Sequence, residues 1–382
     1  MRTIRDIPHF ENIPILVRTA LNVPVGAGGV ANDYRLRRAL PTIRFLSERN
    51  ARVVLISHIG EEGTETLSLV ASALGKLIRR VSFSSETIGE RARDSVRNLL
   101  PGEILVLENL RRHRGEKMND PSFAHELAAL ADIFVEDSFD ACHRTHASIV
   151  GVPKLLPSYA GLLLEEEVQE LSKARTPSKP SLAVIGGMKF NTKEPVVREL
   201  LATYDHVFVG GALANDFFRA RGLETGKSFV SGATSSAIGD ILKHPKLIVP
   251  IDSIVVSAEY VNAPDARARA RITDVEHIRT DDVILDHGPK TSALLSSLAQ
   301  EAKTVLWNGP LGNYERGFVD ATDALAQSVA ASRAYSVVGG GDTVAAIERL
   351  GLLSRFSFVS TGGGAMLDFL AKGTLPGIDA LG

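Results

Sequence analysis

The sequence predicts an α/β fold of two Rossmann-like domains, each a parallel sheet flanked by helices, joined by an interdomain helix. The chain has 382 residues, which exceeds one ordinary domain, and 44% of them are apolar, enough to bury two cores. Short β-branched segments alternate with helix-length segments almost throughout, a pattern typical of parallel sheets covered on both faces. A linker composition at Arg175–Pro180 separates two such series.

Each predicted strand is a short apolar run, and each predicted helix is a longer segment between two such runs. The strands expected in the first half are Ile13–Val17, Arg52–Ser57, Glu103–Leu107 and Asp132–Glu136, with helices at Arg35–Arg49, Leu67–Arg79 and Pro121–Ala131. A helix at Leu162–Ala174 follows, whose acidic run Glu165–Glu167 predicts a solvated face. The second half predicts strands at Leu182–Ile185, His206–Val209, Leu247–Pro250, Thr304–Trp307, Tyr335–Val338 and Ser357–Ser360, with helices at Glu194–Leu201 and Asp320–Ala331.

These elements predict a domain at residues 1–160, an interdomain helix and linker at 161–180, and a second domain at 181–371. The tail, about residues 372–382, is expected to pack back onto the first domain. The charge is nearly balanced, with 43 basic and 45 acidic residues, so nothing global points to nucleic acid or a membrane surface. The single cysteine, Cys142, and the lack of a long apolar run favour a cytoplasmic protein, which we expect to be a monomer.

The loops that follow the second-half strands are rich in glycine. In open α/β sheets ligands bind outside the carboxyl ends of the strands, so these loops predict where function lies. Six of them in one domain predict a crevice for a large phosphate-bearing ligand such as a nucleotide: Gly186-Gly187, Gly210-Gly211, Gly288-Pro289-Lys290, Gly309–Gly312, Gly339–Gly341 and Gly362–Gly364. At Gly339–Thr343 three glycines precede a helix start, where Asp342 is placed to cap the helix or hold Mg²⁺ and Thr343 to bind a phosphate oxygen.

The first-half loops carry hydrogen-bond donors instead. They contribute Arg18 and Asn22, then His58, then Asn109, Arg111, Arg112 and His113, then His143, Arg144 and His146, and Arg35 lies near the start of a helix. Guanidinium groups match phosphate and carboxylate geometry, so the set predicts a small, highly anionic ligand. A nucleotide domain and an anion domain in one chain predict a small-molecule kinase.

Several motifs, in order and spacing, resemble those of the phosphoglycerate kinase family. They are Glu108-Asn109-Leu110-Arg111, His143–Ser148, Trp307-Asn308-Gly309-Pro310, Gly339–Thr343 and Ser360–Ala365, and the resemblance runs from Val17 to Gly377. It implies the phosphoglycerate kinase fold and reversible phosphoryl transfer between 1,3-bisphosphoglycerate and ADP, giving 3-phosphoglycerate and ATP. Transfer is implied to be in line, within a closed interdomain cleft, with Mg²⁺ accompanying the ATP or ADP.

The resemblance also implies roles for residues of the second domain. Lys189 resembles the lysine that follows the transferring phosphoryl group, and Lys193 the one that holds nucleotide phosphates. Asp342 resembles the ligand of the nucleotide's Mg²⁺. Gly363 and Gly364 lead into the last helix, whose start is implied to stabilise the transferring group. The remaining nucleotide-binding positions are Gly210, Gly211, Asn308, Pro310, Glu315 (at the ribose), Gly339, Gly340, Gly341 and Thr343.

In the first domain, Arg35 resembles the arginine that reaches the transition state, and the glycerate substrate is implied to bind Arg18, Asn22, Arg35, His58, Arg111 and Arg144. An acid carboxylate is already ionised near neutral pH, so its attack on ATP requires no general base. The cationic site that the resemblance implies agrees with that chemistry.

The departures from the family pattern concentrate on the acid-binding side. Ala20 stands where the family has aspartate, Glu61 where it has arginine, and Asp140 begins a pair that replaces glycine-threonine. Arg112 and Arg114 are candidates to compensate, or Glu61 and Arg112 face solvent. Two alternatives therefore stay open: a kinase of the same fold for another carboxylic acid, and a nucleotide-binding relative without turnover.

Overall fold

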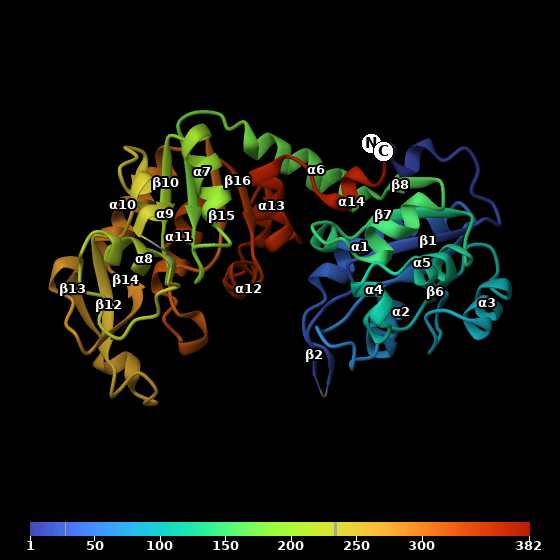
Figure 1. The fold of residues 1–382 in the computed structure, drawn as a ribbon, viewed down its shortest axis with the longest axis horizontal. Coiled ribbons are helices and arrows are strands. Elements are labelled where there is room, and N and C mark those ends of the chain that lie inside the picture. Colours follow the sequence, from blue (N-terminus) through green and yellow to red (C-terminus); the bar gives the residue numbers. More distant parts are fainter. Residues whose placement is uncertain (27, 233–234) are drawn as a thin grey trace. The chain divides into compact units, whose positions relative to one another are not determined.

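The computed structural model describes residues 1–26, 28–232 and 235–382, which form two compact units (Figure 1). Unit 1 comprises Met1–Gln169 and Thr374–Gly382, and unit 2 comprises Glu170–Gly373. The division falls inside helix α6 (Leu162–Arg175), and the chain returns to unit 1 after helix α13 (Gly364–Lys372).

Unit 1 is built on a six-stranded parallel sheet with the order β5-β6-β4-β1-β7-β8. Strand order reverses beside β1, so the loops after β1 and β7 lie where α/β sheets usually bind ligands. The strands are β1 (Pro14–Thr19), β4 (Arg52–Ile56), β5 (Val81–Phe83), β6 (Ile104–Val106), β7 (Ile133–Asp137) and β8 (Ser158–Ala160).

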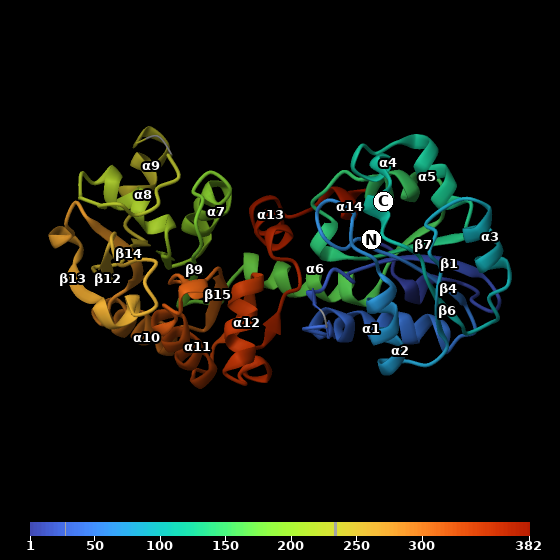
Figure 2. The ribbon, with the colours of Figure 1, turned by 90° about the horizontal axis from the view of Figure 1, so that it is seen from below.

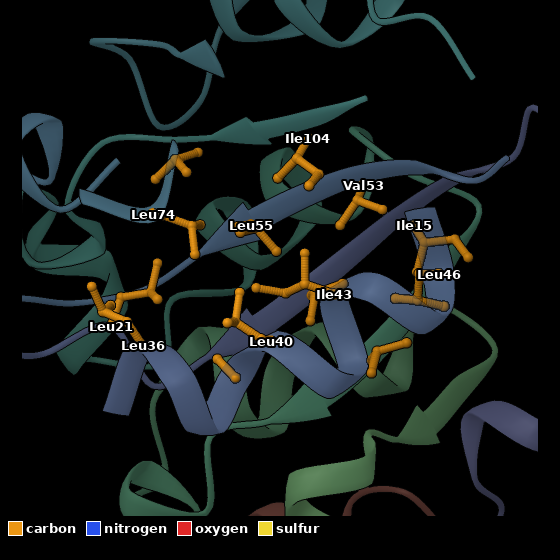
Figure 3. Packing of buried hydrophobic residues seen from close by; sticks show 14 of the residues in the cluster. Ile15, Leu21, Leu36, Leu40, Ile43, Leu46, Val53, Leu55, Leu74 and Ile104 are labelled. Atoms are coloured by element: carbon orange, nitrogen blue, oxygen red, sulfur yellow. The ribbon is translucent and has the colours of Figure 1, made fainter. Parts of the chain in front are cut away.

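The sheet of unit 1 is covered on both faces. One face packs on α1 (Tyr34–Ser47) and α2 (Ser68–Leu77), and the other on α3 (Glu90–Arg97) and α5 (Pro121–Ala128) (Figure 2). In Figure 3, α1 lays Leu36, Leu40, Ile43 and Leu46 toward Ile15, Val53, Leu55 and Ile104. Each such side chain contributes about 1.5–3 kcal/mol by leaving water, and this double-sided core fixes the sheet edge that carries the loops.

Unit 2 is built on a six-stranded parallel sheet with the order β11-β10-β9-β15-β16-β17. Renumbered along the sheet, this is the 3-2-1-4-5-6 order of dinucleotide-binding sheets, with its reversal between β9 and β15. The strands are β9 (Ser181–Ile185), β10 (His206–Val209), β11 (Leu247–Ile248), β15 (Thr304–Asn308), β16 (Tyr335–Gly339) and β17 (Phe358–Val359). The prediction of two parallel sheets flanked by helices is confirmed.

The helices of unit 2 also lie on both faces of its sheet. Helices α10 (Pro289–Glu301), α11 (Asp320–Ala331) and α12 (Gly341–Arg349) pack on one face around Trp307, and α7 (Glu194–Thr203) packs on the other, against α13 (Figure 2). The remaining helices are α4 (Arg114–Lys117), α8 (Leu213–Ala220), α9 (Ser235–Leu242) and α14 (Pro376–Asp379), and a hairpin joins β2 (Val25–Gly26) to β3 (Gly29–Val30) in unit 1.

An antiparallel sheet in unit 2 was not predicted. It has the order β13-β12-β14, from β12 (Asp252–Ser257), β13 (Arg271–Asp274) and β14 (Asp282–His287). The loop at Gly288 follows β14, a strand of this antiparallel sheet, so the expectation that it follows a strand of the parallel sheet was wrong. Asp252 already accepts hydrogen bonds from the Lys290 and Thr291 backbone N–H groups, each at 2.9 Å, so a carboxylate of the chain occupies this helix start.

Contacts within each unit hold the ends of α6. Arg5 and Arg38 pair with Glu165 and Glu166 in unit 1, whereas Arg175 donates to the Leu370 carbonyl at 3.1 Å in unit 2. Glu167, expected on a solvated face, is instead fully buried. In unit 1, the Gly377 N–H in the tail donates to the Cys142 carbonyl at 2.9 Å.

Candidate active-site residues

The predicted acid-binding residues lie in the loops that follow β1, β4, β6 and β7 of unit 1. Arg18 ends the apolar part of β1, His58 follows β4, Arg111 lies in the short 3-10 helix after β6, and Arg144 follows β7. Because these strands are parallel neighbours, their carboxyl ends share one edge of the sheet. Arg35 is the second residue of α1.

Arg18 is only 1% exposed, and every nitrogen of its guanidinium group donates to the protein. Its Nε donates to the Ser148 hydroxyl at 3.2 Å, and Nη1 donates to the Thr19 carbonyl at 2.9 Å and to Ser57 and Ser138. Its Nη2 lies 2.8 Å from His58 Nδ1. Arg18 is therefore a buried cation that ties the loops together, and its direct binding to a ligand remains a prediction.

His58 is neutral in this setting. A guanidinium can only donate, so Nδ1 of His58 accepts from Arg18. Burial, reinforced by the positive charge of Arg18, holds the pKa of His58 well below its usual value. Asn22 links the same loops: its Oδ1 accepts from the Gly60 N–H at 3.2 Å, and its carbonyl accepts from Arg35 at 2.8 Å.

Arg111 is paired with Glu61. Arg111 Nη1 lies 3.0 Å from Glu61 Oε2, and it also donates to the Gly60 carbonyl. The Arg111 side chain is 1% exposed and the Glu61 side chain 69%. Burial lowers the pKa of the Arg111 guanidinium, Glu61 counters this, and Arg144 and Arg18 add to the lowering. Glu61 is thus exposed, as the solvent-facing alternative expected, and it is also the anionic partner of a predicted acid-binding arginine.

Arg35 is paired with Asp140, at 3.6 Å between Nη1 and Oδ2. Asp140 also accepts from the Ser138 hydroxyl at 2.6 Å. Burial acts to raise the pKa of Asp140, but the charge of Arg35 and the Ser138 hydrogen bond outweigh burial and hold it below its usual value. Asp140 is thus an ionised carboxylate against the arginine predicted to reach the transition state.

Arg144 is the remaining guanidinium of the set. Among the described residues, no hydrogen bond or ion pair engages its side chain, and its charge acts on His58, Arg111 and His146. Arg112, considered as a replacement for the missing arginine, pairs instead with Glu108 at 3.2 Å. Ala20 is buried, so no polar side chain replaces the aspartate there.

In unit 2 the glycine loops touch one another at the sheet reversal. A Cβ on Gly186 would lie 2.2 Å from the Pro310 carbonyl oxygen, and one on Gly211 would lie 2.8 Å from the Gly187 nitrogen. Gly340 approaches the Gly309 nitrogen, where an added Cβ would lie at 3.4 Å. The backbones after β9, β10, β15 and β16 therefore form one continuous surface that side chains would disrupt.

Two lysines accompany this surface. The Lys193 ammonium lies over Gly187, where an added Cβ would be 3.2 Å from Nζ, and burial lowers the pKa of Lys193. Lys189, in the loop between β9 and α7, is exposed, and its ammonium has no ion pair within the described part of the chain. The predicted transfer and phosphate lysines thus differ: Lys193 rests against glycine backbone, and Lys189 extends into solvent.

Helix α12 begins at Gly341 beside that surface. An added Cβ on Gly341 would meet nothing within 4 Å, and Asp342 is exposed. The Thr343 hydroxyl is buried without a hydrogen-bond partner among the described residues. Those residues include no cluster of three metal-ligating side chains, so Asp342 offers one carboxylate. One carboxylate beside an open helix start fits Mg²⁺ that takes its other ligands from nucleotide phosphates and water.

Helix α13 presents a second open start. Added Cβ atoms on Gly363 and Gly364 would meet nothing within 4 Å. Asn308 Nδ2 lies 3.5 Å from the Gly363 carbonyl, which connects this start to the end of β15. Glu315 is exposed in a 3-10 helix at Tyr314–Arg316, and no hydrogen bond joins its side chain to the glycine loops in the described ranges.

The support beneath the arginines was missed by sequence reasoning. Glu116 accepts from the Ser148 backbone and hydroxyl, at 2.9 and 2.6 Å, and Ser148 in turn accepts from Arg18. Glu136 is fully buried, and burial raises its pKa well above the usual value despite Arg18. A charged residue inside an apolar strand, as Arg18 is, was the available signal that buried polar partners must exist.

One sheet carries guanidinium groups in the loops at its carboxyl edge, and the other carries glycine loops there. This combination is the one expected of a small-molecule kinase. The family described as Phosphoglycerate kinase matches residues 4–373. The phosphoglycerate kinase of Xanthobacter flavus is 40% identical, covering 100% of this chain and 98% of its own length, and that of Thermomicrobium roseum is 41% identical, covering 100% and 99%. The solved phosphoglycerate kinase of Coxiella burnetii aligns with a TM-score of 0.83 and 38% identity over 99% of this chain and 98% of its own. The solved phosphoglycerate kinase of Pyrococcus horikoshii aligns with a TM-score of 0.87 and 30% identity, covering 100% of this chain and 98% of its own.

The chain belongs to the phosphoglycerate kinase family. It is a phosphotransferase with a carboxyl acceptor, and its reaction is the glycolytic transfer between 1,3-bisphosphoglycerate and ADP that gives 3-phosphoglycerate and ATP. The resemblance and the activity predicted from the motifs are confirmed. Within the described ranges, no helix has both the length and the apolar character needed to cross a membrane.

Proposed function

We propose that the two substrates divide between the units: the acid binds the loops of unit 1, and the nucleotide with Mg²⁺ binds the glycine loops of unit 2. The observation that carries this proposal is the contrast between the two sheet edges. One edge carries Arg35, Arg111 and Arg144, whereas the other offers glycine backbone, two helix starts and Lys193. Guanidinium groups suit carboxylate and phosphate, and helix starts suit nucleotide phosphates.

The chemistry needs charge neutralisation and alignment rather than a base. The acid carboxylate is ionised near neutral pH and acts directly as the nucleophile, while His58 stays neutral. Lys189 is free to follow the transferring phosphoryl group, Lys193 holds the nucleotide phosphates, and Arg35 meets the developing charge. Asp342 is the residue proposed to hold Mg²⁺, which when bound neutralises phosphate charge.

The N-termini of α12 and α13 contribute backbone donors to this arrangement. Gly341 and Gly364 leave these termini open, so phosphate oxygens are able to approach the N–H groups. The residues proposed at the adenosine side, Gly210, Gly211, Asn308, Pro310 and Glu315, form the wall and the ribose contact.

A coupled assay with Mg²⁺, ATP and 3-phosphoglycerate, run beside a panel of other carboxylic acids, tests the proposal. We expect turnover of 3-phosphoglycerate to exceed that of every other acid. Preferred turnover of a different acid would contradict 3-phosphoglycerate as the acid, and would point to the Glu61 and Asp140 pairs as the departures that change acid specificity. Nucleotide binding without turnover of any acid would contradict the catalytic roles of Lys189 and Arg35.

A further inference from the structure

The ion pair between Glu61 and Arg111 joins an exposed carboxylate to a buried cation. At 3.0 Å, with exposed fractions of 69% and 1%, it differs from an ordinary surface pair, in which both partners are solvated. Glu61 can exchange the guanidinium for water at little cost, whereas Arg111 cannot leave its place. The two partners therefore differ in their freedom to move.

The backbone that carries Glu61 is held from several sides. The Gly60 N–H donates to Asn22, the Glu61 carbonyl accepts from the Lys117 ammonium, and a Cβ on Gly63 would lie 2.2 Å from the Arg111 carbonyl oxygen. Gly63 has a φ of +78°, which favours glycine. The turn is thus fixed against Arg111, and only the Glu61 side chain is left to swing away.

The buried guanidinium of Arg111 is stabilised by an anionic partner. Arg144 and Arg18 both act on it as like charges, and Glu61 is the anion that offsets them. Two of its nitrogens, Nε and Nη2, are buried and have no hydrogen-bond partner in the described ranges. An acid substrate bearing carboxylate and phosphate would satisfy the same need that Glu61 satisfies in its absence.

We propose that Glu61 is a displaceable internal counter-anion of Arg111, which the acid substrate must replace, so that Glu61 sets the affinity of this chain for its acid. This specificity role rests on the proposed binding of the acid at unit 1. Asp140 differs from Glu61, because only 7% of its side chain is exposed and it accepts a hydrogen bond from Ser138, so it stays with Arg35. Glu61 and the acid substrate therefore compete for Arg111.

The test compares Glu61→Gln with Glu62→Gln. Glu62 is the adjacent exposed carboxylate and makes no ion pair within the described residues, so it controls for net charge. We expect Glu61→Gln to lower the KM for 3-phosphoglycerate about fivefold, the upper end for a partly exposed pair. The kcat and the KM for ATP should stay unchanged, and Glu62→Gln should leave all three at wild-type values.

A second measurement separates this inference from the proposed function. Inorganic phosphate is titrated calorimetrically into each protein without nucleotide, and Glu61→Gln should bind it more tightly than wild type by a similar factor. An unchanged or raised KM with unchanged phosphate affinity would overturn the role of Glu61 while turnover upholds the function. Failure of the wild type to turn over 3-phosphoglycerate would count against the function alone, and the phosphate titration would still decide on Glu61.

Discussion

The loops of unit 1 and unit 2 differ in the groups that they offer to an anionic ligand at a sheet edge. In unit 1 the candidate residues are side chains that already bind one another, as Arg18 binds His58 and Arg35 binds Asp140. In unit 2 the corresponding surface is backbone, as where Gly186 meets Pro310. A side-chain site is tuned by a single carboxylate, whereas a backbone site changes only when its glycines change.

The comparison is tested most strongly at Lys189, the exposed side chain on the backbone-built side. Lys189→Ala should lower kcat by about 10²–10³, because it removes the positive charge that we propose acts on the transferring phosphoryl group. Nucleotide affinity should be mostly retained, since Lys193 and the glycine loops remain. Steady-state kinetics and nucleotide titration measure both. The control is Lys303→Ala, which lies at the opposite edge, before β15; equal kcat values for the two variants would remove Lys189 from the transfer step.

A smaller effect is expected at Gly341, where the backbone surface is open. Gly341→Ala adds a methyl group that meets nothing within 4 Å of the protein, so Tm should hold within about a degree. If phosphates approach this helix start, the methyl group should block one hydrogen bond to a charged phosphate. The KM for ATP should then rise about tenfold, which corresponds to the free energy of one such bond. Gly239→Ala in α9 is the matched control, since its added Cβ also meets nothing within 4 Å. An unchanged KM would place the nucleotide away from α12.

The last effect is on stability rather than activity: it concerns pH, and it involves one residue of each unit. Asp137 in unit 1 accepts from Leu163 and Leu164 at the start of α6, and Asp286 in unit 2 accepts from Ala321 at the start of α11. Burial raises the pKa of each carboxyl to about 7, from an ordinary value of 3.8. Between those values the folded protein keeps a proton that the unfolded chain releases, so stability is full below pH ~4 and falls as pH rises to ~7.

Asp137→Asn and Asp286→Asn should each reduce the loss of stability between about pH 5 and pH 8 by about 2–3 kcal/mol, because about two pKa units separate pH 5 from a pKa of about 7. Urea unfolding at about pH 5 and pH 8 measures it. A wild-type slope retained in both variants would contradict the assignment, and a loss in only one would show which unit carries the dependence.

The parallel sheets were predictable because their signals are local. The run at His206–Val209 and the helix at Asp320–Ala331 form where the apolar patterns placed them. The sheet of β12, β13 and β14 was not predictable in the same way, because β12 and β14 pair across a long polar connection. Its discovery also explains Gly288, whose neighbouring helix start is filled by Asp252.

At the candidate site, sequence identified the residues but not their partners. The motifs named Arg35, Arg111 and the glycine loops, and the departures named Glu61 and Asp140. That Glu61 pairs with Arg111, and Asp140 with Arg35, depends on which strands are neighbours in the sheet. Sequence patterns predict which face of a helix or strand is buried. Predicting which residues of two distant loops form a pair requires knowledge of the strand order in the sheet.

The return of the chain to unit 1 has a consequence for its biosynthesis. Unit 2 is continuous from Glu170 to Gly373, so a ribosome delivers all of it before residues 374–382 emerge. Those residues complete unit 1: Gly377 is buried there, and a Cβ on it would lie 2.9 Å from the Cys142 sulfur. During synthesis, all of unit 2 therefore leaves the ribosome before Gly377 can pack against Cys142 in unit 1.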